Sequence, residues 1–137
     1  MKFHKFLPKP PNVKVSDWQE EWLAEVCPET YKILPTDDLN AMRERSEKLS
    51  SYIPTLTILI FCNKQYVDKL KYEFAEANPP PQSGITAWNK LEANYTRNAR
   101  RDLEFLEALH HDIEDKLNKS QTNMNIKASE VRKGLSN

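Results

Sequence analysis

The chain has few glycines and no long apolar run, and each shortage disfavours a class of protein. It holds only two glycines in 137 residues, against nine prolines. Phosphate-binding loops and the tight turns of β sandwiches are built on glycine, so the shortage disfavours both. The most apolar stretch, IPTLTILIFC at 53–62, has ten residues, whereas a membrane-spanning helix needs about 20. The sequence therefore predicts no membrane partner.

The chain also lacks an excess of charge of either sign, because 20 basic residues balance 20 acidic ones. No overall field directs it towards nucleic acid or an anionic membrane. The charges are nevertheless segregated: residues 1–14 hold four lysines and no acid, and residues 119–137 carry a net charge of +3. Such basic ends can lie on the acidic body or reach for an anionic partner.

Cysteine is scarce as well. Cys27 and Cys62 lie far apart, and the basic N-terminal stretch MKFHKFLPKPP has no apolar signal-peptide core. Two isolated thiols without a secretory signal are expected to stay reduced in a reducing compartment. We therefore expect a cytoplasmic protein without a disulfide framework.

Three segments are expected along the chain. Residues 1–15 form an extended basic arm, because Pro8, Pro10 and Pro11 favour polyproline conformations. Phe3 and Phe6 place large apolar groups in that arm, which suggests that it docks on something. Residues 16–119 form an α-helical domain. Residues 120–137 lose the apolar periodicity and form a flexible basic C-terminal tail, with a short helix around 128–132.

Within the central segment, apolar residues recur every three or four positions, which is the spacing of one helix face. A first helix begins at Ser16, which has capping-box spacing to Gln19, and Pro28 should end it. Trp18 and Trp22 lie one turn apart on its face. Further helices are expected from 36 or 37 to 53, from 54 to 77 and from 85 to 119.

The fold class that follows is all-α, a helical bundle of about four helices with a long antiparallel helical hairpin. The helix at 85–119 would be about 50 Å long at a rise of 1.5 Å per residue. That is longer than a compact domain of this size needs, so part of it should pair with another long helix or meet a partner. Asn63 falls on a core position of the third helix, where a polar group either sets the register between helices or is only partly buried.

A local basic cluster lies in NYTRNARR at 94–101. Arg97, Arg100 and Arg101 have no acid between Glu92 and Asp102. Guanidinium groups bind phosphates, and arginine is also enriched at protein interfaces. The cluster therefore fits a protein-binding surface, with nucleic acid as the alternative.

The stretch FLEALHHDIEDKL at 105–117 contains the one metal-like spacing. Glu107 and His110 form Glu-x-x-His, which bundle proteins use twice, with two more carboxylates, to hold two metal ions. This chain has one such motif, and only a homodimer would supply the second. Successive residues are about 100° apart on a helix, so Glu107 lies some 60° from the apolar stripe. We therefore predict neither a metal nor another cofactor.

No catalytic apparatus is recognisable either. The chain has no GxSxG, no HExxH and no paired CxxC, and pairing Cys62 with His110 or His111 has no support because an apolar run raises a thiol pKa. We predict a non-enzymatic helical protein-interaction module, a small adaptor, inhibitor or subunit of a larger intracellular assembly. It would bind another protein or its own copy through the long C-terminal helix and the N-terminal arm. The residues predicted to bind the partner are Phe3, Phe6, Trp18, Trp22, Arg97, Arg100 and Arg101. The alternative is a small helical subunit that contacts nucleic acid through the three arginines and the lysine-rich ends.

Overall fold

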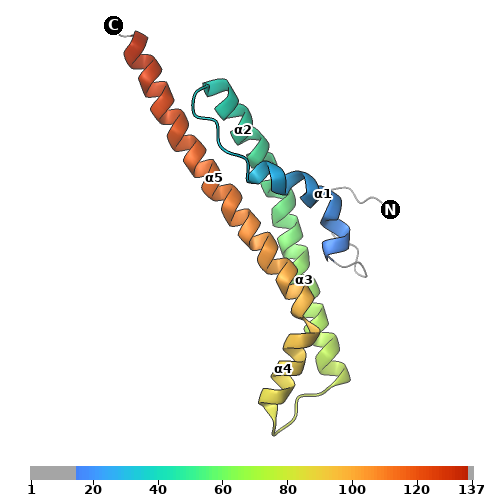
Figure 1. The fold of residues 1–137 in the computed structure, drawn as a ribbon. Helices are drawn as coiled ribbons and strands as arrows, with labels where there is room; N and C mark the ends of the chain where they lie inside the picture. The colour runs from blue at the N-terminus through green and yellow to red at the C-terminus, as the bar shows by residue number, and fades with distance from the viewer. Residues whose placement is uncertain (1–14, 136–137) are drawn as a thin grey trace.

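The computed structural model describes the backbone of residues 15–135 and the side chains of residues 20–134. The expected arm at 1–15 lies, except for Val15, outside the described residues. The described part contains five helices and no strand: α1 (Val15–Thr30), α2 (Leu39–Ser51), α3 (Ile53–Ala77), α4 (Ile85–Tyr95) and α5 (Arg97–Leu135) (Figure 1). The prediction of an all-α bundle is confirmed. No described helix has both the length and the apolar character needed to cross a membrane.

Helix α5 is the spine of the molecule. Figure 1 shows α2 and α3 following one another along its side, while α1 lies near their junction. Asn63 of α3 donates a hydrogen bond to the Ala99 carbonyl, and Ser46 of α2 shares one of 2.5 Å with Ser120. From the first pair to the second, residue numbers fall from 63 to 46 on the α3–α2 side and rise from 99 to 120 on α5. Helices α2 and α3 therefore both run antiparallel to α5. The long antiparallel hairpin is therefore present.

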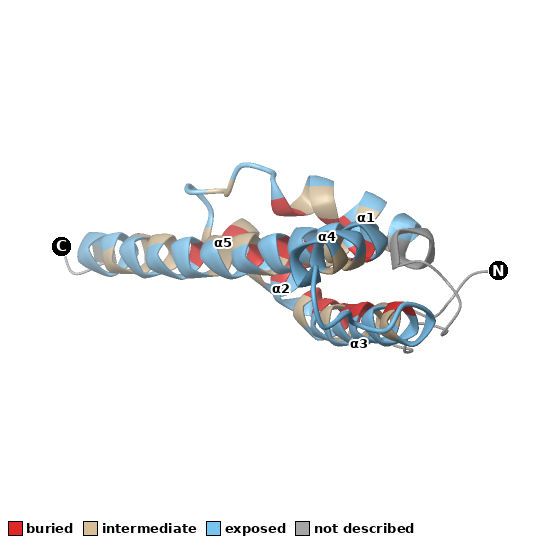
Figure 2. Ribbon diagram, turned by 90° about the horizontal axis from the view of Figure 1, so that it is seen from below, coloured by how far each residue is buried: buried red, intermediate tan, exposed pale blue. Residues whose placement is uncertain are grey.

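The core lies where α1, the α2–α3 junction and α5 meet. Figure 2 shows buried residues on the faces that the helices turn towards one another. Tyr52, between α2 and α3, is buried and makes a T-shaped ring contact with Trp22 of α1, with 6.2 Å between ring centroids. The residues of this buried cluster are Val26, Leu49, Tyr52, Leu56, Leu59, Leu106, Leu109 and Ile113. The apolar stripes seen in the sequence thus meet in one contiguous core.

The first two helices begin and end close to the predicted positions. Helix α1 continues two residues past Pro28, because a proline in the last turn removes only one intrahelical hydrogen bond. The Thr30 hydroxyl, in turn, donates to the Val26 carbonyl at 2.9 Å. Helix α2 begins two to three residues later than expected, with Asp38 as the N-cap that accepts from the Asn40 amide at 2.9 Å.

The prediction of one unbroken helix over 85–119 was wrong, since the chain breaks at Thr96 between α4 and α5. Neither proline nor glycine causes the break. Thr96 is buried, and its hydroxyl donates to the Glu92 carbonyl at 3.1 Å. Arg100 donates to the Ala93 carbonyl at 2.7 Å and to the Thr96 hydroxyl at 3.0 Å. The Thr96 amide still donates to the Glu92 carbonyl at 3.1 Å, so these side-chain bonds add to the backbone bonds at the break.

The expected end of the last helix near Lys119 was also wrong, because α5 continues to Leu135 through most of the predicted flexible tail. Ser120, Thr122, Asn123 and Asn125 are weak helix formers. The helix nevertheless continues, because Ser120 is buried against Ser46 of α2, and within α5 the Gln121 amide donates to Asn125 at 3.0 Å one turn on. Tertiary contacts on an inner face stabilise a helix more than intrinsic propensity does.

Candidate interaction surfaces

The aromatic residues predicted to bind a partner are only partly described. Phe3 and Phe6 lie outside the described residues, and so does the side chain of Trp18. Trp22 is half-buried and packs on Tyr52, so much of its ring belongs to the core. It can therefore offer a partner only the rim of its ring.

The three arginines of the predicted cluster have two different environments. Arg97 and Arg101 are exposed one turn apart on the first turns of α5. Arg100 is half-buried and folds back onto the Thr96 break. The structure thus places two guanidinium groups on the surface and uses the third inside the chain.

The Glu-x-x-His spacing on α5 does not assemble a metal site. His110 Nδ1 lies 3.5 Å from Glu114 Oε1 on the next turn, while Glu107 and His111 are exposed. No group of three His, Cys, Asp or Glu side chains among the described residues is placed to hold a metal ion. Cys27 and Cys62 are both free, and burial raises the pKa of the Cys27 thiol.

Residues 63–77 of α3 and helix α4 together form an apolar surface that the sequence did not predict. We call this surface the α3–α4 end. Phe74 of α3 packs against Trp88 and Tyr95 of α4, with 5.3 and 5.6 Å between ring centroids. Trp88 Nε1 also donates to the Asn78 carbonyl at 2.7 Å. This aromatic cluster holds α4 to α3 as a two-helix layer.

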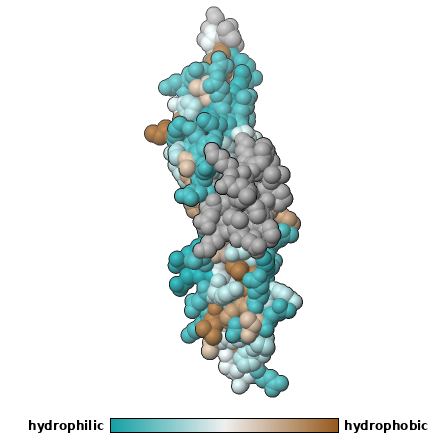
Figure 3. All heavy atoms as spheres, turned by 90° about the vertical axis from the view of Figure 1, so that its right-hand side faces the viewer, coloured by the Kyte–Doolittle hydropathy of each residue, from teal (hydrophilic) through white to brown (hydrophobic). Residues whose placement is uncertain are grey.

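Helix α4 is nevertheless poorly covered. All its side chains are described, and none of its residues is buried. Ile85, Leu91 and Tyr95 remain 46%, 59% and 50% exposed. Figure 3 shows apolar atoms reaching the surface over this end of the molecule. Large apolar groups at this exposure lose about half of the free energy that full burial would give them.

The connection between α3 and α4 determines where α4 lies. It contains three consecutive prolines, Pro79–Pro81, which stop α3 and keep the chain extended. Gly84 then takes a left-handed conformation, φ 77°, directly before α4. A side chain at this position would be strained, so glycine lets the chain turn back along α3.

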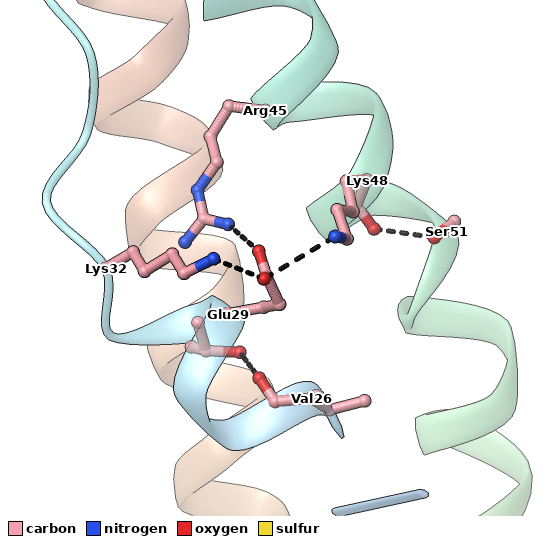
Figure 4. Close-up of polar contacts among 7 residues, drawn as sticks. Val26, Glu29, Lys32, Arg45, Lys48 and Ser51 are labelled. Carbon is pink, nitrogen blue, oxygen red and sulfur yellow. Dashed lines mark hydrogen bonds and ion pairs between the residues drawn. The ribbon is translucent and has the colours of Figure 1, made fainter. Parts of the chain in front are cut away.

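A second surface forms where the end of α1 meets α2. Glu29 of α1 accepts from Lys32 at 2.5 Å and from Arg45 at 2.6 Å, and its carboxylate lies 3.5 Å from the Lys48 ammonium (Figure 4). The side chains of Arg45 and Glu29 are only 9% and 16% exposed. Three cations thus converge on one carboxylate. We call these four residues the Glu29 cluster.

The cations hold Glu29 in its ionised form. The hydrogen bond from Lys32 lowers its pKa most; burial opposes this, and the charges of Lys32 and Lys48 and the Arg45 hydrogen bond lower it further, to about 2. The sequence carried little signal for this cluster. Glu29 and Arg45 are 16 positions apart, and an irregular connection decides whether they meet.

A groove of about 660 Å³ lies between α2 and α5. Serine hydroxyls and amides line much of it, among them Ser46, Ser50 and Gln121, and Glu47 is the one ionisable residue in the lining. Neither a histidine nor a cysteine is part of that lining.

Comparison with known proteins adds no match: no family model, no curated protein and no solved structure matches this chain. The function proposed below therefore follows from the surfaces of the chain itself.

Proposed function

We propose that this chain is a non-enzymatic helical protein-interaction module, a small adaptor, inhibitor or subunit of a larger assembly. Its binding surface is the α3–α4 end with the adjoining first turns of α5. Helix α4 and the first turns of α5 fall within the predicted helix at 85–119, through which binding was expected, whereas residues 63–77 of α3 lie outside it. We also propose the N-terminal arm as a second contact with the partner, and the support for this contact comes from its sequence alone.

One observation carries the proposal: α4 has large apolar side chains but no buried residue. An isolated helix of 11 residues is marginal in water, and α4 has α3 as its main support. A partner that covered Leu91 and Tyr95 would bury apolar area and stabilise α4 at the same time. Aromatic side chains at the centre of a contact commonly supply most of its binding free energy.

The exposed Arg97 and Arg101 lie at the base of this surface. Arginine is enriched at protein interfaces because its planar guanidinium offers several donors and an apolar face. The two free thiols support placing the protein in the cytoplasm, where a partner would be another intracellular protein.

Site-specific photo-crosslinking tests the proposal. A benzoylphenylalanine replaces Leu91, and a control variant carries it at Glu44, an exposed position of α2 outside the α3–α4 end. In cells of the source organism, position 91 should give a defined adduct and position 44 should not. Equal or absent crosslinking at both positions would contradict the proposed surface.

Nucleic acid remains the second candidate, favoured by the exposure of Arg97 and Arg101 one turn apart. A contact of this kind weakens steeply as salt rises, because each neutralised phosphate releases counterions. The wild-type protein should raise the fluorescence polarisation of a labelled duplex at low salt. The double variant Arg97→Ala/Arg101→Ala should abolish this increase. A wild-type protein that fails to bind the duplex at low salt would eliminate this candidate.

A further inference from the structure

The Glu29 cluster is unbalanced in charge. Lys32, Arg45 and Lys48 surround a single carboxylate, so the four residues carry a formal excess of two positive charges. The Lys32 and Lys48 side chains are 61% and 50% exposed, so water screens much of their charge, whereas the Arg45 side chain is only 9% exposed. The local excess of positive charge favours binding of an oxyanion beside Arg45.

Arg45 shows where such an anion would bind. Its side chain is 9% exposed, and Nη1 is the atom that donates to Glu29. Nε and Nη2 are buried and have no hydrogen-bond partner among the described residues. Buried donors on a charged group are costly to leave unpaired, and native structures rarely do so.

The two unpaired atoms form one edge of the guanidinium. Nε and Nη2 direct two parallel N–H bonds to the same side, the fork that binds the two oxygens of a carboxylate or phosphate. Figure 4 shows this edge on the side of the guanidinium turned away from Glu29. Glu29 occupies the other side, so it positions Arg45 without blocking the fork.

The connection between α1 and α2 offers a way in. Residues 31–38 have no regular structure, and they are held at both ends: Tyr31 donates to Asp112 at 2.6 Å and Asp38 caps α2. Between these anchors, Ile33 is 94% exposed. Leu34 beside it packs against the core and fixes the connection there, whereas Lys32 and Ile33 are exposed. A local shift of these two exposed residues would admit a small anion to the fork.

We propose that Arg45, with Lys32 and Lys48 beside it, forms a binding site for an oxyanion, a phosphate or a carboxylate. The side-on fork of Arg45 contacts two of its oxygens, and the exposed ammonium of Lys32 contributes charge. The site is separate from the α3–α4 end and does not depend on the proposed interaction function.

Titration with inorganic phosphate tests the site on the full chain. The wild type, Arg45→Lys and the control Arg43→Lys are melted in sodium phosphate and in sodium chloride of equal ionic strength. Arg45→Lys keeps the charge but loses the fork, whereas Arg43→Lys makes the same exchange at an exposed position of the same helix. A ligand that binds only the folded state raises the Tm in proportion to the logarithm of its concentration once the site is nearly saturated.

We expect phosphate to raise the Tm of the wild type and of Arg43→Lys above the chloride value, and to lose this effect in Arg45→Lys. A phosphate effect that survives in Arg45→Lys, or one absent from the wild type, would overturn the proposal. Because Arg45→Lys can weaken the fold, the Arg45 Nε–H resonance of the wild type is followed by NMR as well. It should shift saturably with phosphate, and no shift would also overturn the site.

A parallel titration with sodium acetate distinguishes the source of the oxyanion. A saturable shift of the same resonance with acetate indicates that a carboxylate, such as an acidic side chain of a partner, fits the fork. A shift with phosphate alone indicates a phosphate-bearing ligand.

Discussion

Residues of one type, close together in the sequence, have different roles in this protein. Arg97 and Arg101 face solvent, whereas Arg100 between them ties the start of α5 to the end of α4 through the Ala93 carbonyl. Arg45 donates to Glu29 through Nη1, whereas its Nε and Nη2 have no partner among the described residues (Figure 4). Local charge counts cannot separate these roles, because they follow from which backbone or carboxylate oxygen each guanidinium can reach.

Arg100 is therefore expected to matter for stability. Arg100→Ala should lower the free energy of unfolding by about 1–3 kcal/mol, because hydrogen bonds to a charged donor are lost and the Ala93 carbonyl loses its partner. Urea denaturation measures the change. Arg97→Ala and Arg101→Ala are the controls and should stay within about 0.5 kcal/mol of wild type, as surface substitutions do. Equal losses in all three variants would show that Arg100 has no special contact.

Glu29 makes stability depend on pH. Its pKa is lowered from 4.5 to about 2 in the folded protein. A carboxylate with a depressed folded pKa contributes stability above its unfolded pKa, and this contribution is lost as pH falls through the folded value. The wild type should therefore lose stability between about pH 4.5 and pH 2, and Glu29→Gln should be less stable at pH 7 but lose less over that interval.

Chemical denaturation at a series of pH values checks this prediction. Glu20→Gln, which removes an exposed carboxylate from the same helix, is the matched control. The prediction fails if Glu29→Gln and Glu20→Gln lose stability equally as the pH falls.

Asn63 is a polar residue in the core whose role can be measured. It is fully buried, its Nδ2 donates to the Ala99 carbonyl at 3.1 Å, and its Oδ1 has no partner among the described residues. Replacing a partly satisfied buried group by an apolar one of similar size is close to neutral or stabilising. Asn63→Leu should therefore change the free energy of unfolding by between 0 and about +1 kcal/mol.

The cavity left by Asn63→Ala should instead lower the free energy of unfolding by about 1–3 kcal/mol. Both changes are read from urea midpoints at constant slope. A large loss in Asn63→Leu would mean that the amide sets the register between α3 and α5 and cannot be replaced.

At the scale of helices, periodicity was sufficient to predict the type and approximate position of each element, and insufficient to predict where the last ones end. The apolar spacing runs on through Thr96, so the sequence shows no break; the break depends on a buried threonine and on Arg100. The opposite error occurred after Lys119. There the local composition is unfavourable, and packing of Ser120 on α2 maintains the helix.

The surfaces were predictable to a smaller degree. The exposed Leu91 and Tyr95 belong to the stripe that the sequence marked as core, because a pattern shows which residues share a face but not whether another helix covers it. The Glu29 cluster was missed for a related reason. Its members come from two helices and a connection, and only the folded geometry brings them together.

Helix α4 should be the least stable of the described helices. It is short, lacks buried residues and has few backbone hydrogen bonds to lose when it opens. Amide hydrogen exchange should be at least about ten-fold faster over 86–94 than over 106–113 of α5, where Leu106, Leu109 and Ile113 are buried. Comparable protection in the two segments of the protein alone would mean that α4 is already covered, by its own copy or by residues outside the described range.

At the scale of the whole molecule, the described chain is elongated. Helix α5 has 39 residues, or about 58 Å at 1.5 Å per residue, and Figure 1 shows the other helices arranged along it. A compact chain of 137 residues would have a radius of gyration of about 14 Å. A sphere with that radius of gyration is about 36 Å across. Because α5 alone is longer than that, the mass is spread along one axis and a large fraction of the surface stays exposed.

Small-angle X-ray scattering, read together with the mass from light scattering, decides how this rod occurs in solution. A monomer with the described fold should have a radius of gyration well above the value of about 14 Å for a globule of this length. A dimer joined through the two α3–α4 ends would be much longer still, because that end lies at one extreme of the rod (Figure 1). Its formation should be lost in Leu91→Ser. A monomer near 14 Å would contradict the extended arrangement, since α5 can then no longer run as one straight helix beyond α1 and α2.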